Sequence, residues 1–215
     1  MYKVIGIEES VYNAVYGPYK GSYTFSIVPT LIRPKSRGWI RLNSTSPYEH
    51  PIINPNYFAD DQDMKVLIEG MKIAINVSST APFLRYNATL FTTKFPGCKA
   101  FEIYSDEYLR CAINMFTFTI WHFSGTYKMG SENDTSAVVD PQLRVKGVEG
   151  LRVVDASIMP TVISGNINAP TIAIAEKIAD LMKGVRIIPF LPPMNQTMID
   201  HLPDLPTEEL DEIVF

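Results

Sequence analysis

The segment LRVVDASIMPTVISGNINAPTIAIAEKIADLMKG, residues Leu151–Gly184, contains a short apolar run, a polar loop and a longer stretch with helical apolar spacing. We expect Leu151–Asp155 to be a buried strand, because an uninterrupted apolar run suits a parallel sheet. We expect a helix from about Pro170 to Lys183, with Pro170 in its first turn and Gly184 just beyond its end. The loop between them would follow the carboxyl end of a strand, which is where open α/β sheets place ligands.

Two asparagines, Asn166 and Asn168, precede the expected helix. The first N–H groups of a helix have no intrahelical partner and carry partial positive charge, so a group that gains negative charge is stabilised there. Each asparagine can either cap the helix or direct a polar group into a pocket. The residue type alone favours capping.

A second segment, TIWHFSGTYKMG (Thr119–Gly130), places His122 where an apolar run ends and a glycine-containing stretch begins. The chain has 3 histidines, and the other two, His50 and His201, lie in proline-flanked connections to which we assign no catalytic role. Taken alone, a histidine that follows an apolar run is more often structural than catalytic. A catalytic histidine at this position would serve as a proton acceptor near neutral pH.

Upstream of these segments, the first twenty residues are expected to be irregular. The remaining expectations follow from apolar spacing, capping residues and prolines. They are strands at Ser22–Ile32 and Gly38–Leu42, an extended connection at Ser46–Phe58, and helices at Asp60–Ser79 and from the N-cap Ser105 to about Phe116. Short extended segments are expected at Ala137–Val139 and Gln142–Val145.

Composition and motifs exclude several classes of function. The 215 residues carry a net charge of −4 without a lysine or arginine block, so there is no electrostatic footprint for nucleic acid. The sequence contains no apolar run long enough to span a membrane. The motifs H-E-x-x-H, C-x-x-C, G-x-G-x-x-G, G-x-x-x-x-G-K and G-x-S-x-G do not occur, so we expect no metal site, no glycine-rich phosphate loop and no serine nucleophile elbow.

The cysteines and the glycosylation motifs indicate in which cellular compartment the protein resides. Cys98 and Cys111 are either two buried thiols or one disulfide. Asn-x-Ser/Thr motifs (sequons) begin at Asn43, Asn76, Asn87, Asn133 and Asn195, whereas chance would give about one or two in such a chain. The excess favours a secreted protein in an oxidising compartment. The acidic N-terminal segment, which has no signal-peptide pattern, argues in the other direction.

Several of these segments together resemble a known family. WHFSGTYKMG, VVDPQLRVKGVEGLRVVDASIMP and SGNINAPTIAIAEKIADLM are similar to the C-terminal signature of the glucose-methanol-choline (GMC) oxidoreductases. RPKSRGWIRLNSTSPYEHPIINPNYF resembles a segment of their substrate domain. The resemblance covers about Val28 to Gly184 and is nearest to the insect glucose dehydrogenase-like group, to which PGC around Cys98 and CAI at Cys111 are also similar.

The resemblance implies an α+β fold. Residues 1–136 would form a substrate-binding domain with an antiparallel sheet and helices. Residues 137–186 would supply the C-terminal strand and helix of an incomplete FAD-binding α/β domain. The proline-rich, acidic residues 187–215 would form a tail.

The resemblance also implies a chemistry. Family members bind FAD and oxidise CH–OH groups of alcohols or sugars, with hydride transfer to the flavin. By matching positions, His122 would accept the hydroxyl proton and Asn168 would hold the substrate oxygen. The implied cofactor-contacting residues are Trp121 and Thr171 near the ring, and Asp155 and Ala156 near the ribityl-pyrophosphate part.

The chain also departs from the family pattern. Family members are usually more than twice as long and begin with the G-x-G-x-x-G turn that grips the FAD diphosphate. We therefore expect that this chain alone does not bind FAD tightly. The alternative to an oxidoreductase portion is a non-catalytic fragment or binding protein that keeps the substrate-domain fold. Substrate identity is left open, and oxygen, a quinone or a dye are all compatible as electron acceptor.

Overall fold

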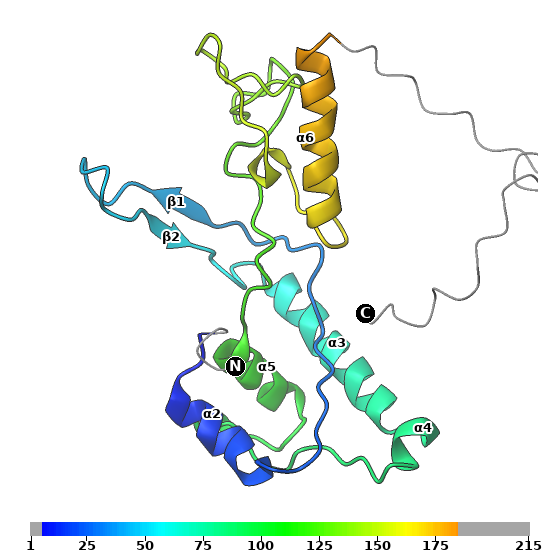
Figure 1. Cartoon of the computed structure of the whole chain (residues 1–215). Helices are drawn as coiled ribbons and strands as arrows, with labels where there is room; N and C mark the ends of the chain where they lie inside the picture. The colour runs from blue at the N-terminus through cyan, green and yellow to red at the C-terminus, as the bar shows by residue number, and fades with distance from the viewer. Residues whose placement is uncertain (1–5, 185–215) are drawn as a thin grey trace, which may run out of the picture. The chain divides into compact units, whose positions relative to one another are not determined.

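The computed structural model of the chain describes residues 6–184, which form an α+β fold of helices and a small antiparallel sheet (Figure 1). The chain divides into two units, residues 1–175 and 176–215, and each is considered by itself. The expected tail 187–215, together with Asn195 and His201, lies outside the described residues. The elements are α2 (Glu9–Tyr16), η1 (Gly17–Tyr19), β1 (Trp39–Arg41), β2 (Ile52–Asn54), α3 (Asp61–Ser78), α4 (Ala81–Leu84), η2 (Pro96–Cys98), α5 (Asp106–Phe116), η3 (Ala156–Ile158) and α6 (Asn168–Met182), where η denotes a 3₁₀ helix.

The two longest helices of the first unit begin where their capping residues predict. The side chain of Asp60 accepts a hydrogen bond of 2.9 Å from the N–H of Gln62, which starts α3. Ser105 accepts one of 3.2 Å from the N–H of Tyr108, which starts α5. Acidic residues follow each cap, where they interact favourably with the positive end of the helix. Both predicted helices are confirmed to within one residue at each end.

The core of the first unit lies between α3 and α5, which pack against each other. Its fully buried side chains include Leu109 and Cys98. A disulfide joins Cys98 of η2 to Cys111 of α5, so the structure settles the alternative left open by the sequence in favour of the disulfide. The buried cluster consists of Met64, Ile68, Cys98, Tyr108, Leu109, Ala112 and Ile113.

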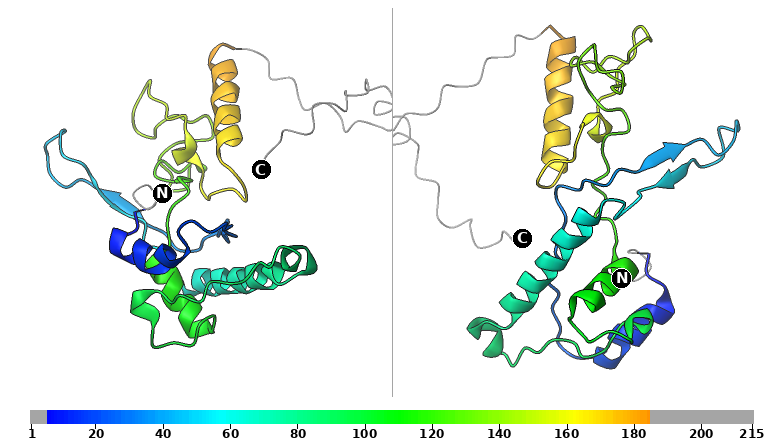
Figure 2. Two further views of the ribbon diagram at one scale, coloured as in Figure 1. Left: turned by 60° about the horizontal axis from the view of Figure 1, so that its bottom comes forward. Right: turned by 180° about the vertical axis from the view of Figure 1, so that it is seen from behind.

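The sheet differs from the prediction in its partner strand. β1 pairs antiparallel with β2, with Trp39 opposite Asn54 and Arg41 opposite Ile52. The two strands and their connection form one hairpin ribbon, seen from two further sides in Figure 2. The predicted strand Ser22–Ile32 is wrong, because this segment joins no strand ladder. Pro29, near its middle, has no N–H to donate, and such a residue is excluded from the interior of a sheet. Pro29 instead lies against α3, where a Cβ added at Gly70 would be 3.1 Å from the Pro29 Cβ.

Two further expectations are corrected. Leu151–Asp155 is not a strand: it makes one isolated bridge, Arg144 to Arg152, and no neighbouring strand of the described chain pairs with it. The Leu151 carbonyl and the Val153 N–H are bonded to Val145 and Leu143, but the pairing extends no further than this bridge. The first twenty residues are not irregular, since α2 and η1 form there. Rings of Tyr12 and Tyr16, one helical turn apart, stack at 5.0 Å on α2.

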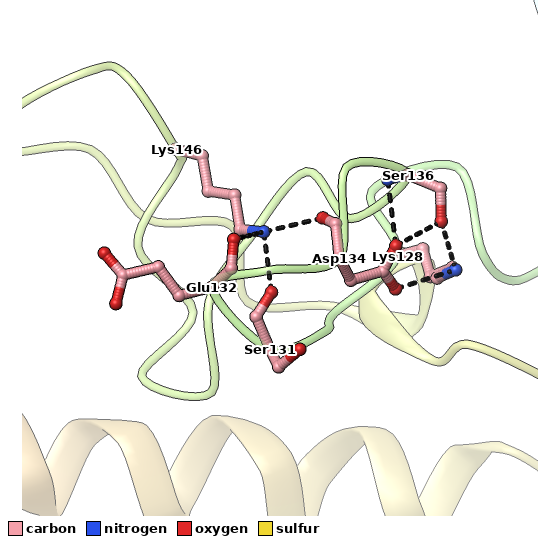
Figure 3. Close-up of polar contacts among 6 residues, drawn as sticks. All are labelled: Lys128, Ser131, Glu132, Asp134, Ser136 and Lys146. Atoms are coloured by element: carbon pink, nitrogen blue, oxygen red, sulfur yellow. Dashed lines mark hydrogen bonds and ion pairs between the residues drawn. The ribbon is translucent and has the colours of Figure 1, made fainter.

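Loop 130–146 is held by lysines rather than by a sheet (Figure 3). Lys146 donates hydrogen bonds to the carbonyl oxygens of Ser131, Glu132 and Asp134, at 2.8, 3.3 and 2.8 Å. Lys128 pairs with the Asp134 carboxylate at 3.1 Å. The predicted extended segments Ala137–Val139 and Gln142–Val145 lie within this loop. They form only isolated bridges, from Val139 to Met129 and to Val145 and from Arg144 to Arg152. Within residues 6–184, no helix has the length and apolar character needed to cross a membrane.

Candidate functional site

The segment that follows His122 lies against η3. The N–H of Tyr127 donates to the carbonyl of Ser157 at 3.1 Å, and the N–H of Met129 donates to the carbonyl of Ile158 at 2.9 Å. These bonds connect residues about thirty positions apart in the sequence. They bring the His122 loop next to the loop that begins at Asp155.

The residue before His122 has a strained backbone. Trp121 has φ +62°, in the left-handed region, and its N–H donates to Thr119 Oγ1 at 2.9 Å. For a bulky residue this conformation costs about 1–3 kcal/mol and persists only where the surroundings enforce it. His122 follows directly and is partly exposed, and among residues 6–184 its imidazole has no hydrogen-bond partner. Its ring nitrogens are therefore available to a ligand.

At the start of α6 the two asparagines have different environments. The Oδ1 atom of Asn166 accepts the N–H of Asn168 at 2.9 Å, so Asn166 performs the capping. The N–H and the hydroxyl of Thr171 both donate to the Ile167 carbonyl, at 3.0 and 2.7 Å. These bonds start the helix two residues before the predicted Pro170. The exposed Asn168 side chain has no hydrogen-bond partner within the described chain.

Asp155 starts η3. Its Oδ1 atom accepts the N–H of Ser157 at 2.7 Å and also the Ser157 hydroxyl. The second carboxylate oxygen of Asp155 has no partner in the part of the chain that the structure describes. Ala156, the first residue of η3, is partly buried. Asp155 thus has one oxygen committed to local structure and one available to a ligand.

All six residues singled out from the sequence border one open hollow of the first unit, with a volume of about 2260 Å³. Its apolar lining comes partly from α3 and α5, through Leu67, Ile75, Leu109 and Ile113. The hollow exceeds the ~300–1,000 Å³ typical of a pocket for one small ligand. Its lining runs from Val15 to Thr171, so it is an open depression across the unit and not the pocket of a single ligand. The six residues are Trp121, His122, Asp155, Ala156, Asn168 and Thr171.

Tyr19 is a polar residue of the hollow that the sequence did not indicate. Its hydroxyl accepts the N–H of Thr92 at 2.9 Å and lies 3.2 Å from the Thr93 hydroxyl. Hydrogen bonds with Thr92, and then with Thr93, lower the pKa of Tyr19 to about 8. These partners are more than seventy residues away in the sequence, so no local pattern could have identified them.

The described residues hold no group of three or more His, Cys, Asp or Glu side chains placed as metal ligands would be. The polar groups around the hollow are the His122 imidazole, amides, hydroxyls, two carboxylates (Asp63 and Asp155) and two cationic groups (Arg37 and Lys128). Such a set suits an organic substrate or cofactor, through hydrogen bonds and proton transfer.

Comparison with known proteins identifies relatives of this fold. Residues 34–175 match the family profile described as GMC oxidoreductase. Glucose dehydrogenase [FAD, quinone] of Drosophila melanogaster is 46% identical over 162 residues, which cover 75% of this chain and 26% of the relative. Mitochondrial choline dehydrogenase of Homo sapiens is 39% identical over 180 residues, covering 82% of this chain and 27% of the relative.

A solved structure also resembles this chain. A crystal structure of formate oxidase superposes with a TM-score of 0.61 at 34% sequence identity, covering 72% of this chain and 26% of that chain. The chain therefore spans about a quarter of the length of the curated relatives that it matches.

Proposed function

Because the chain belongs to the GMC oxidoreductase family, we propose that it is the C-terminal portion of an FAD-dependent oxidoreductase acting on CH–OH groups of an alcohol or sugar. One observation carries the proposal: residues 34–175 match the GMC oxidoreductase family, and His122 and Asn168 lie within that match. Both side chains also border the hollow and have no hydrogen-bond partner in the described chain. A relative named for FAD and quinone, glucose dehydrogenase, supports the cofactor class. We assign residues 1–136 to substrate binding, 137–186 to the flavin domain, and 187–215 to a tail.

The residues at the hollow fit the ring end of FAD. Trp121 is 57% exposed and offers an aromatic face. Thr171 donates its hydroxyl proton to Ile167 but keeps oxygen lone pairs that accept hydrogen bonds. Asp155 and Ala156 would lie toward the ribityl-pyrophosphate part. The G-x-G-x-x-G turn for the diphosphate is not among the 215 residues, so this chain alone would not hold FAD tightly.

The chemistry assigned to the chain's own residues is proton removal and substrate orientation. His122, whose imidazole suits proton transfer near neutral pH, accepts the proton of the substrate hydroxyl. Asn168 holds the same oxygen through its amide and so orients the carbon that loses hydride. The positive end of α6, which begins at Asn168, favours negative charge on a bound group. FAD, when bound, accepts the hydride.

A chimera tests this function. The 162 matched residues of Drosophila melanogaster glucose dehydrogenase are replaced by those of this chain, and dye reduction is measured with a panel of alcohols and sugars. We expect a flavin absorption band and turnover. His122→Ala should lower kcat by about 10²–10⁴-fold, since that is the usual contribution of a general base. His50→Ala is the matched control and should leave kcat unchanged.

The outcomes separate the candidate functions. A flavin-loaded chimera in which His122→Ala leaves turnover intact contradicts the role of His122. A flavin-loaded chimera without turnover on any substrate favours the second candidate, a non-catalytic fragment or binding protein that keeps the substrate-domain fold. This candidate rests on the short length of the match relative to the whole enzymes. A stoichiometric flavin band in the purified chain alone would overturn the proposal that it does not hold FAD by itself.

We also propose that the chain is secreted. The disulfide between Cys98 and Cys111 and the five sequons support this location, because both belong to oxidising, secretory compartments. Mass spectrometry of the natural protein with and without reductant tests it. Two free thiols in the natural protein would count against secretion.

A further inference from the structure

The asparagines of the described chain differ in what their side chains do. Those of the sequons, Asn43, Asn76, Asn87 and Asn133, are exposed and have no side-chain hydrogen-bond partner among residues 6–184. Most of the others are engaged. Asn54 accepts the N–H of Asn56 at 2.8 Å, Asn56 donates to the Arg37 carbonyl at 3.0 Å, Asn114 donates to the Arg110 carbonyl at 3.1 Å, and Asn166 caps α6. Asn13 and Asn168 are outside sequons and also lack a partner.

Three of the four sequons have a feature that disfavours a sugar. Asn76 lies within α3, where the hydroxyl of Ser78 donates to the Ile75 carbonyl at 2.7 Å. Asn133 lies in the loop that Lys146 and Lys128 hold in place (Figure 3). Asn87 borders the hollow that carries the candidate site. At Asn76 the hydroxyl of the motif is already bonded, at Asn133 the loop is held in place by the two lysines, and at Asn87 a glycan would compete with a ligand of the hollow.

Asn43 has none of these features. It lies in the connection between β1 and β2, a projecting ribbon in both views of Figure 2, and residues 42–51 are exposed throughout. Its amide and the hydroxyl of Thr45 make no hydrogen bond with the described residues. A hydrophilic sugar here would displace no contact of the fold.

We propose that Asn43 is an N-glycosylation site of this protein, which rests on the secretory location proposed above. The donor is a lipid pyrophosphate-linked oligosaccharide. The side-chain Nδ2 of Asn43 forms a bond to the anomeric carbon of the first sugar, the bond from that carbon to the pyrophosphate oxygen breaks, and the amide nitrogen releases one proton. Thr45 supplies the hydroxyl that the motif requires.

The test uses the full chain, fused to a secretory leader and expressed in insect cells. Tryptic peptides are analysed before and after enzymatic removal of N-linked sugars in heavy-oxygen water, which converts a glycosylated asparagine to labelled aspartate. We expect labelling at position 43. Thr45→Ala should abolish the labelling and Thr45→Ser should retain it. Neither Asn43 nor Thr45 takes part in the candidate site. Protein retained inside the cells is analysed in the same way.

The leader imposes entry into the secretory pathway, so the result tests the site and not the location. An unlabelled Asn43 in the wild-type chain overturns the assignment, and so does labelling that persists in Thr45→Ala. The same chain expressed without the leader serves as the unglycosylated reference. A chain that is glycosylated with the leader but reaches the cytosol in its natural form would refute secretion while leaving the assignment of Asn43 intact.

Discussion

Hydrogen bonding and burial shift the pKa values of two tyrosines near the hollow in opposite directions. Bonds with Thr92, and then with Thr93, lower the pKa of Tyr19 to about 8. Burial raises the pKa of Tyr104 to about 12, and its hydroxyl donates to the Phe91 carbonyl at 2.6 Å. Both residues border the hollow, so loss of their hydroxyl protons at alkaline pH would add negative charge to it.

Phenolate absorbance in a spectrophotometric titration checks the lowered pKa of Tyr19. One tyrosine should ionise at a pH about two units below that at which most tyrosines of the chain ionise. Tyr19→Phe should remove that early phase. Tyr23→Phe, at a fully exposed position, is the control and should leave it unchanged. Since the folded pKa of Tyr19 is depressed, its contribution to stability is full above the unfolded pKa of about 10 and is lost as pH falls through the folded value. An early phase that survives Tyr19→Phe contradicts the assignment.

At the scale of elements, Asp63 attaches the segment before β1 to α3. It is only 3% exposed and accepts the backbone N–H groups of Lys35 and Ser36, each at 2.8 Å. Burial alone would raise its pKa, but these hydrogen bonds and the nearby Arg37 charge outweigh it, so the pKa lies below the ordinary value. A buried carboxylate with two such donors stabilises the junction as an anion.

Asp63→Asn should therefore lower the free energy of unfolding by about 1.5–3 kcal/mol, because the amide keeps only one acceptor oxygen for two N–H donors. Since the folded pKa is depressed, the contribution of Asp63 is full above its unfolded pKa of about 3.9 and disappears as pH falls further. Urea unfolding at neutral pH and below pH 4 measures both effects. Asp61→Asn, on the exposed face of α3, is the control and should have a much smaller effect. Equal losses in both variants would contradict the argument.

The disulfide between Cys98 and Cys111 is the second stabilising feature at the scale of elements. It joins η2 to α5 across 13 residues next to the core. Cys98→Ala combined with Cys111→Ser should lower the free energy of unfolding by about 3 kcal/mol, mainly because the unfolded chain becomes freer. Alanine is chosen at the buried end so that no hydroxyl is left without a partner. Reduction of the wild-type chain should reproduce the effect, and an unchanged unfolding midpoint after reduction would sink the prediction.

At the scale of the whole molecule, the first unit leaves many large apolar side chains exposed. Tyr23, Ile40 and Ile53 are among them, and all three border the hollow. Extended apolar surface of this kind marks sites where another molecule or another part of a protein packs. The chain matches about a quarter of the length of its curated relatives, and we interpret this surface as the area that the rest of such an enzyme would cover.

The isolated chain should therefore bind an apolar fluorescent dye and self-associate as its concentration rises. Replacing Tyr23, Ile40 and Ile53 by serine should reduce both. The unfolding midpoint should fall only slightly, because the three side chains lie outside the core and only the Ile40–Ile53 cross-strand pair is lost. Dye fluorescence and sedimentation check this prediction. The flavin-loaded chimera should bind less dye than the isolated chain, and equal binding would argue that the surface stays open.

Local sequence patterns predicted what depends on neighbours in the chain. Asp60 and Ser105 cap α3 and α5, and Gly184 has the positive φ of +69° expected beyond the end of α6. Each depends on side-chain and backbone groups within a few residues. The roles of His122 and Asn168 rest on residue type and on the family resemblance, and they stay predictions.

Only the tertiary structure decided what depends on distant partners. Ser22–Ile32 and Leu151–Asp155 have strand-like composition. Within the described chain the first joins no strand and the second makes only one isolated bridge. Tertiary contacts also selected the disulfide and brought His122 and Asn168 to the border of one hollow. The physical reason is that helix caps close over three or four residues, whereas strands, disulfides and pockets join segments whose proximity no local pattern encodes.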